Sequence, residues 1–205
     1  MNRGLVLKAI RELWPATLLF GVALGAVEGL LAFALPAIQE QFSSQWAQVR
    51  FVQTLVRAML GSDVAQGAGP ELFLTVCWVH PVVLAITWAH AIIVCTRVPA
   101  GEVDRGTVEV LLGLPVSRGQ LFLSETVVWL ASALVILAFA LIGNAAGSSG
   151  VSAELRAGPS RLAVVVANLF CLYLAVGGCA WLVSALSDRR GKAMTVVFVL
   201  VLASF

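Results

Sequence analysis

Charged residues are scarce in this sequence. Only 12% of its 205 residues carry a charge, whereas 60% are hydrophobic, and the mean hydropathy is +0.97. A water-soluble domain cannot cover so much apolar surface with so few charges. The net charge is only +2, and no basic stretch interleaved with aromatic residues is present, which argues against nucleic acid as a partner. The composition therefore predicts a protein whose solvent is lipid.

Signatures of catalysis and of metal binding are also missing. The sequence holds no GxxxxGK[ST] phosphate loop, no HExxH and no GxSxG. Its four cysteines lack paired CxxC spacing and lie inside or at the ends of apolar runs, which favours a role as small hydrophobic residues. We therefore expect no catalytic site, no metal site and no bound cofactor on this chain.

What the sequence does contain is long apolar runs. A bilayer core of about 30 Å requires about 20 apolar residues per helix. One further apolar run, residues 193–205, is shorter and would reach only about 20 Å as an α-helix. We expect an all-α, polytopic membrane bundle that forms one domain over residues 1–205, with about four and a half spans. The intact protein would then continue beyond Phe205 with at least one more helix. The four full-length runs are residues 16–38, 72–98, 121–143 and 162–186.

The first fifteen residues read as a separate helix. Residues 4–14 are amphipathic and predict a short helix lying in the membrane interface, with Lys8, Arg11 and Glu12 facing water. Pro15 would mark the entry into the first span, a place where proline is tolerated.

The connections between spans predict the orientation. Residues 39–71 form an outer segment in which residues 41–60 carry apolar side chains at helical spacing, and both an external gate and a simple spacer fit this pattern. Residues 144–160 are rich in Gly, Ser and Ala and predict a loop. Lys and Arg collect in the N-terminal flank, in the second-to-third connection and in residues 187–192. Because cytoplasmic loops are enriched in these residues, we expect a cytoplasmic N-terminus.

The first span carries small residues and one acid. Gly21, Gly25 and Gly29 recur at every fourth position, which favours close helix packing within the protein or across a dimer. Glu28 borders this stripe near the predicted middle of the membrane, where a carboxylate is costly unless it is protonated, paired or facing water. Two interpretations remain open: Glu28 lines a cargo path, or it is a neutral acid hydrogen-bonded across a helix interface.

Polar residues also lie in the second and fourth spans. His80 and His90 would project about 80° apart around a helix, a poor arrangement for sharing one metal ion. We expect these two histidines, together with Asn168 and Tyr173 of the fourth span, to be hydrogen-bonded interior residues. The helix should kink at His80 because Pro81 follows. Together with Glu28, His80 and Asn168 are the candidates for a cargo path.

Charged residues are more frequent in residues 102–118 than in the apolar runs on either side. We expect a single helix over residues 103–112, ended by Pro115, with an apolar face that includes Leu111 and Leu112. Such a helix could dock in a groove of a soluble protein or lie at the lipid surface, and the residues alone favour neither.

This run resembles the cytoplasmic signature of ATP-binding-cassette (ABC) transporter permeases of the type-2 exporter class. The resemblance implies that residues 99–120 hold a coupling helix that inserts into a separate ATPase subunit, which would carry ATP and Mg. It also implies about six spans in the intact protein and a homodimer or pseudo-dimer of permeases. One position departs from the pattern, since Glu125 stands where the family usually has lysine. The matching residues are Glu102, Gly106, Thr107, Glu109, Leu111, Leu112, Pro115, Ser117 and Arg118.

We therefore expect a permease subunit of an exporter, driven by ATP that a partner hydrolyses, and not an enzyme in its own right. One alternative keeps the fold but transmits ATP-driven motion to an extracytoplasmic partner without moving cargo. Another is a membrane enzyme or anchor that uses Glu28, His80 and His90.

Overall fold

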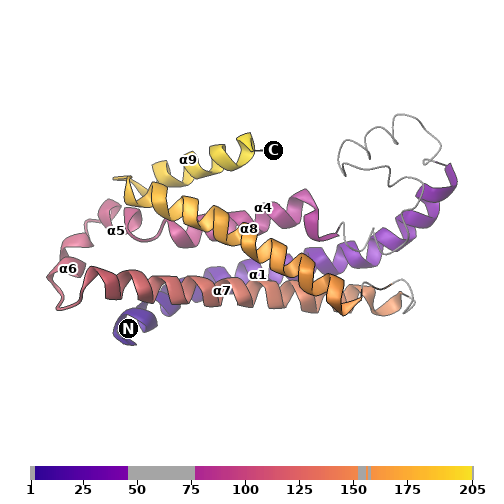
Figure 1. Cartoon of the computed structure of the whole chain (residues 1–205), viewed down its shortest axis with the longest axis horizontal. Helices are drawn as coiled ribbons and strands as arrows, with labels where there is room; N and C mark the ends of the chain where they lie inside the picture. Colours follow the sequence, from indigo (N-terminus) through magenta and orange to yellow (C-terminus); the bar gives the residue numbers. More distant parts are fainter. Residues whose placement is uncertain (1–2, 46–76, 152–155, 157, 205) are drawn as a thin grey trace.

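A computed structural model describes residues 3–45, 77–151, 156 and 158–204, and the side chains of residues 35–45 are outside this description. Within these ranges the chain is helical and contains no strand. Three helical stretches are long and apolar enough to cross a membrane: Arg3–Ala34, Arg118–Gly150 and Pro159–Ala185. The predicted all-α membrane bundle is confirmed. Its elements (Figure 1) are α1 (Arg3–Gln45), η2 (Cys77–Val79), α4 (Pro81–Cys95), α5 (Ala100–Asp104), α6 (Val108–Gly113), α7 (Arg118–Gly147), η3 (Ser148–Gly150), α8 (Pro159–Ala185) and α9 (Arg190–Ala203).

Helices α1 and α7 lie side by side along the bundle, and glycines bring their backbones into contact (Figure 1). A Cβ atom added to Gly25 would lie 2.7 Å from the carbonyl oxygen of Phe139, and one added to Gly29 would lie 3.0 Å from that of Gly143. A Cβ on Gly143 or Gly147 would overlap the backbone of α1. Small residues stabilise helix pairs in lipid because they let more backbone atoms make van der Waals contact. The glycine stripe of α1 therefore has its partner within the same chain, on α7.

Helix α1 runs without a break from Arg3 through Pro15. The separate N-terminal helix that the sequence predicts is therefore wrong in its boundary. Leu5, Ala9 and Leu13 are all buried and continue the face of α1 that packs on the rest of the bundle. Because this buried face begins at Leu5, residues 4–14 pack on the bundle as the first part of α1.

The second apolar run contains a shorter helix than expected. Its predicted first residues, 72–76, lie outside the described residues, and α4 begins only at Pro81. The imidazole Nδ1 of His80 accepts a hydrogen bond from the backbone N–H of Val82 at 3.3 Å and so caps α4. Proline at the first helical position lacks the N–H that would otherwise be unsatisfied there. The predicted kink at His80 is therefore wrong: a new helix, α4, begins after this residue.

Two of the predicted connections between spans begin inside the preceding helix. The outer segment 39–71 begins inside α1, which continues to Gln45, and the rest of the helix predicted over residues 41–60 lies outside the described residues. Helix α7 continues through Asn144 to Gly147 and is followed by η3, so the loop predicted over residues 144–160 starts later than expected. Asn144 is buried against α1, which keeps this last turn of α7 folded.

Aromatic side chains join α7 to α8. The ring of Trp129 lies 6.1 Å from that of Tyr173 and 5.5 Å from that of Trp181, and Phe122 stacks on Trp181 at 4.7 Å. These separations are typical of favourable aromatic pairs. The buried core around them draws on every long helix and includes Leu24, Val83, Ala91, Val128, Ala133, Ile136, Leu169 and Val197.

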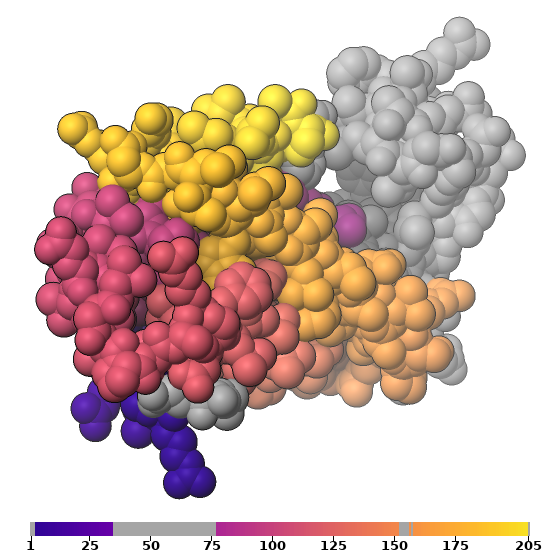
Figure 2. Space-filling model, turned by 60° about the vertical axis from the view of Figure 1, so that its left-hand side comes forward, coloured from indigo at the N-terminus to yellow at the C-terminus, as the bar shows by residue number. Residues whose placement is uncertain are grey.

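One end of the bundle collects the N-terminus of α1, helices α5 and α6, and the turn between α8 and α9 (Figure 1). We call it the charged end. Figure 2 shows it from the front: the segment that contains α5 and α6 forms a broad surface, with the first residues of α1 below it and the α8–α9 region above.

The contact between α1 and α7 predicts that changing a glycine to alanine destabilises the protein at this contact but not at an exposed position of α8. Gly143→Ala should lower the free energy of unfolding by about 1–3 kcal/mol, because the added methyl group overlaps the backbone of Gly25. Gly178→Ala is the matched control, since nothing lies within 4 Å of its Cβ position. The control should be neutral or stabilising by up to about 1 kcal/mol. Thermal unfolding in detergent measures both, and equal melting temperatures for the two variants would contradict the described packing.

Candidate functional site

The segment that links α4 to α7 folds into two short helices, α5 and α6. The single helix predicted over residues 103–112 is therefore wrong. Gly106 interrupts it with φ of +69°, a conformation that glycine adopts without the strain a Cβ would introduce. The backbone N–H of Thr107 donates to the carbonyl of Glu102 at 3.0 Å and closes the turn between the helices.

The end of this segment is set by local capping. Helix α6 ends at Gly113, two residues before Pro115, close to the predicted stop. The Ser117 hydroxyl accepts from the N–H of Gln120 at 3.1 Å, and the Gln120 side chain accepts from the N–H of Ser117 at 3.2 Å. This capping box satisfies two N–H groups at the start of α7. Ser117 thus has a structural role inside the chain, and the exposed Arg118 opens α7.

The two helices differ in exposure. In α5 Glu102 is buried, with 3% of its surface exposed, whereas α6 exposes two of its four apolar side chains. Val110 is 68% exposed and Leu112 is 57% exposed, while Leu111 is buried. The two leucines of the sequence pattern therefore differ: the side chain of Leu111 packs inward, whereas that of Leu112 is exposed.

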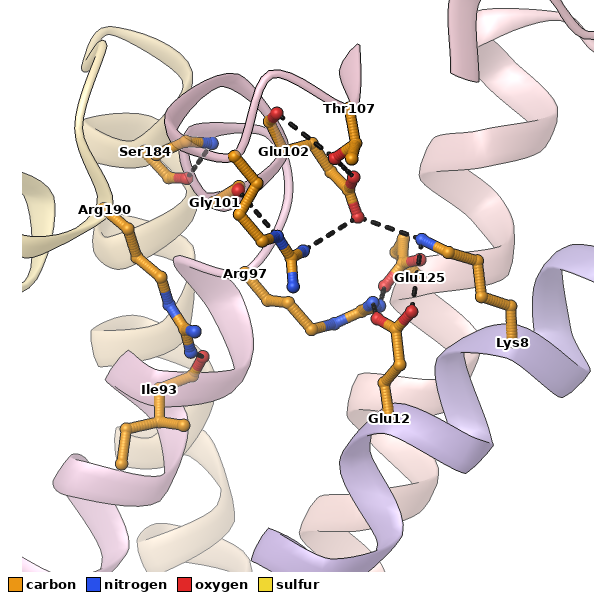
Figure 3. Close-up of polar contacts among 12 residues, drawn as sticks. Lys8, Glu12, Ile93, Arg97, Gly101, Glu102, Thr107, Glu125, Ser184 and Arg190 are labelled. Carbon is orange, nitrogen blue, oxygen red and sulfur yellow. Dashed lines mark hydrogen bonds and ion pairs between the residues drawn. The ribbon is translucent and has the colours of Figure 1, made fainter. Parts of the chain in front are cut away.

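Charged side chains at the charged end form one series of alternating sign (Figure 3). Arg105 Nη2 lies 3.0 Å from Glu102 Oε1, and Lys8 Nζ lies 2.9 Å from the same oxygen. Lys8 Nζ also lies 3.4 Å from Glu12 Oε1, one helical turn along α1. We call the complete series the ion-pair chain; its members in order are Arg105, Glu102, Lys8, Glu12, Arg97 and Glu125.

Arg97 forms the second half of the ion-pair chain. It lies in the turn between α4 and α5, and its guanidinium donates to Glu12 on α1 through Nη1 and to Glu125 on α7 through Nη2. The Arg97 and Glu125 side chains are 5% and 8% exposed. A buried charge must be paired, because removal from water is costly for an isolated ion. Glu125, which departs from the family pattern, is therefore the partner of a buried arginine.

Glu102 is held as a carboxylate. Burial alone would raise its pKa, but the hydrogen bonds from Thr107 and Lys8, together with the charges of Lys8 and Arg105, outweigh burial and lower the pKa below its ordinary value of 4.5. The Thr107 hydroxyl donates to Glu102 Oε2, while Lys8 and Arg105 share Oε1. Two residues of the sequence pattern, Glu102 and Thr107, are thus bonded to each other.

Helix α5 is also fixed to α8 and α9. The N–H of Ala100 donates to the Ser184 hydroxyl at 3.1 Å, and the Trp181 indole N–H donates to the carbonyl of Val98 at 2.8 Å. The N–H of Arg190 donates to Asp104 at 3.4 Å. The α5 helix therefore lies between α1 on one side and the α8–α9 turn on the other.

A groove of about 570 Å³ separates α6 from the start of α1. Its charged residues are Lys8, Glu12, Glu102 and Arg105, so it opens onto the ion-pair chain. Its remaining lining is Gly4, Leu5, Thr107, Val110, Leu111, Leu114, Pro115 and Val116.

Residues 8–205 match the family described as ABC-2 family transporter protein. The chain belongs to this family. No curated protein and no solved structure matches it. The chain is accordingly a multi-pass membrane permease subunit of an ABC transporter, and an ABC ATPase subunit is its partner.

In this ABC-2 permease, Glu28 lies between α1 and α7. It is fully buried, and its Oε2 accepts a hydrogen bond from Asn144 Nδ2 at 3.3 Å in the last turn of α7. Glu28 therefore lies beside the last turn of the α7 helix. The hydrogen bond across a helix interface favours the second of the two interpretations of this residue.

The other two cargo-path candidates have different surroundings from the buried Glu28. His80 caps α4, and Asn168 is exposed on α8. The cavities described at the charged end and at Ser160–Val165 on α8 include none of the three cargo-path candidates. His90 is fully buried, with Nδ1 3.0 Å from the Tyr173 hydroxyl and Nε2 3.3 Å from the Thr17 hydroxyl. His90 and Tyr173 are hydrogen-bonded interior residues, as predicted. The same prediction is wrong for Asn168, which is exposed, and for His80, which caps α4 and is only half-buried.

Sequence reasoning missed most of the ion-pair chain. Lys8 and Glu12 are partly exposed, in line with the prediction that they face water, but the sequence does not predict their partners Glu102 and Arg97. The available signal was the four-residue spacing of Lys8 and Glu12, which places both on one face of a helix together with Leu5 and Ala9.

The depressed pKa of Glu102 predicts a pH-dependent contribution to stability. It is fully present above about pH 4.5, the pKa of an unperturbed glutamate, and is lost as the pH falls through the lower pKa of the folded state. Glu102→Gln should therefore lower the free energy of unfolding by about 1.5–3 kcal/mol at pH 7. The difference from the unsubstituted protein should shrink below about pH 4.5.

Unfolding in detergent between pH 7 and pH 3 measures this difference. Glu109→Gln is the control, because Glu109 is exposed on α6. A Glu102→Gln deficit that stayed constant across this range would contradict the role of the carboxylate charge.

Proposed function

We propose that this permease exports cargo across a bacterial inner membrane and that α6 is the helix that docks in its ATPase subunit. The observation that supports the proposal is the outward-facing apolar surface of α6. Val110, Leu112 and Leu114 are 68%, 57% and 44% exposed, at the end of the bundle where the charged residues collect. In the lipid region exposed apolar side chains need no partner, but at a water-facing end they are typical of a protein interface.

The two short helices suit different tasks. Helix α6 carries the exposed apolar side chains beside the groove, whereas α5 is held by hydrogen bonds to α8 and α9 and by ion pairs to α1. A docking element on a firmly held base can pass a displacement to the membrane helices instead of deforming alone. We infer that the ATPase displaces α6 and that α5 passes this displacement to α1, α8 and α9.

The energy in this proposal comes from the partner. ATP and Mg would bind the ATPase subunits, and closure of two ATPase subunits would displace the α6 helices of two permease copies paired as a homodimer or pseudo-dimer. The N-terminus, the α5–α6 segment and the α8–α9 turn would then lie on the cytoplasmic side. The positive charges of Arg105, Arg118, Arg189, Arg190 and Lys192 at this end agree with that orientation.

A single acidic substitution on α6 tests the docking surface. Leu112→Asp should weaken the affinity of the permease for its ATPase subunit by about tenfold or more, because it places a charge where an apolar side chain would be buried. The measurement is copurification of the ATPase from the native host in mild detergent, followed by titration of the purified subunits.

The matched control is Leu186→Asp. Leu186 is 81% exposed and follows α8 at the same end of the bundle, but it lies outside the α5–α6 segment. It should retain the ATPase. Loss of the ATPase in the control but not in Leu112→Asp would move the docking surface to the α8–α9 turn. Failure of any ATPase to copurify with the unsubstituted protein would overturn the proposal.

A further inference from the structure

The ion-pair chain connects three parts of the molecule that are far apart in sequence. Arg105 and Glu102 belong to the α5 region, Lys8 and Glu12 belong to α1, and Glu125 belongs to α7 (Figure 3). Its three cations and three carboxylates balance, so the series is neutral as a whole. No part of it requires an external counter-ion.

Lys8 is the link between the two halves of this series. It is the residue that bonds both Glu102 on α5 and Glu12 on α1, at 2.9 Å and 3.4 Å. If Lys8 lost its charge, Glu102 would keep Arg105 and Thr107, and Glu12 would keep Arg97. Every remaining charge would therefore retain a partner, while the ion pair between α5 itself and α1 would be lost. Arg97, in the turn before α5, would still pair with Glu12 and Glu125.

The position of Lys8 is unusual for a residue that serves stability alone. Its side chain is 38% exposed, and exposed ion pairs contribute little to stability. It also lines the groove that separates α6 from α1, so it bridges a gap and does not fill a packed interface. A long flexible cation suits such a place, because it can follow its partner when the two helices shift.

We propose that Lys8 is a positioning residue that makes α1 follow α5 when the ATPase displaces the α5–α6 segment. Through Glu12 and Arg97 the displacement continues to Glu125 on α7. The glycine contact holds α1 and α7 together along their length, so both helices move as a pair. This inference rests on the proposed docking of the ATPase at α6.

Hydrogen exchange of the permease–ATPase complex in lipid nanodiscs, with and without ATP and vanadate, tests the proposal. In the unsubstituted complex we expect nucleotide to change the exchange of α6 and of residues 4–14. In Lys8→Gln the change in α6 should remain, whereas the change in residues 4–14 should fall about fivefold or more. Lys8→Arg should restore the response, since it restores the cation.

Two further variants keep the result interpretable. Glu12→Gln breaks the same link from the other side, because Lys8 keeps Glu102 and Arg97 keeps Glu125, and it should behave like Lys8→Gln. Lys192→Gln removes a cation that pairs with Asp188 at 3.7 Å outside the ion-pair chain, and it should respond like the unsubstituted protein.

The outcomes separate the two proposals. A full nucleotide response of residues 4–14 in both Lys8→Gln and Glu12→Gln would overturn the positioning role while leaving the docking of the ATPase intact. Equal loss in the Lys192→Gln control would also overturn it, since the effect would then follow charge in general. Absence of any nucleotide response in α6 of the unsubstituted complex would overturn the docking proposal, and this inference with it.

Discussion

The neutralisation of buried charge at one end of an apolar bundle decides how the helices of this permease meet. Arg97 and Glu125 are almost fully buried, and burying either charge without the other would be costly. The pairing requires the α4–α5 turn, α1 and α7 to converge, because each contributes a charge that the others need. The segment that carries the family signature is thereby attached to the two longest helices of the chain.

A second constraint acts away from the charged end. There the backbones of α1 and α7 are in contact at four glycines, Gly25, Gly29, Gly143 and Gly147. In the same region Asn144 donates a hydrogen bond to Glu28. Lipid offers no competing hydrogen bonds, so close packing and a single buried polar contact both stabilise the pair. Since α1 and α7 are held at both ends, movement of one without the other would break either the glycine contact or the ion pairs with Arg97.

The sequence predicts the apolar helices well because length and hydropathy are local properties. The spans within α1, α7 and α8 follow directly from their apolar runs, as does the stop before Pro115. Local patterns do not contain the ion pairs of Lys8 with Glu102 and of Glu12 with Arg97, because these partners lie far along the chain. Such patterns also do not predict that the helix divides at Gly106. Glu125 illustrates the difference: the pattern marks it as a departure, and only the fold supplies Arg97 as its counter-charge.

The most direct measurement is a cryo-electron microscopy structure of the permease in lipid nanodiscs with the ATPase that copurifies with it. We expect α6 to lie in a groove of the ATPase, with Val110 and Leu112 covered, and Lys8 to bridge Glu102 and Glu12 behind it. An ATPase bound at the opposite end of the bundle, or at the α8–α9 turn with α6 uncovered, would contradict the assignment of the coupling site.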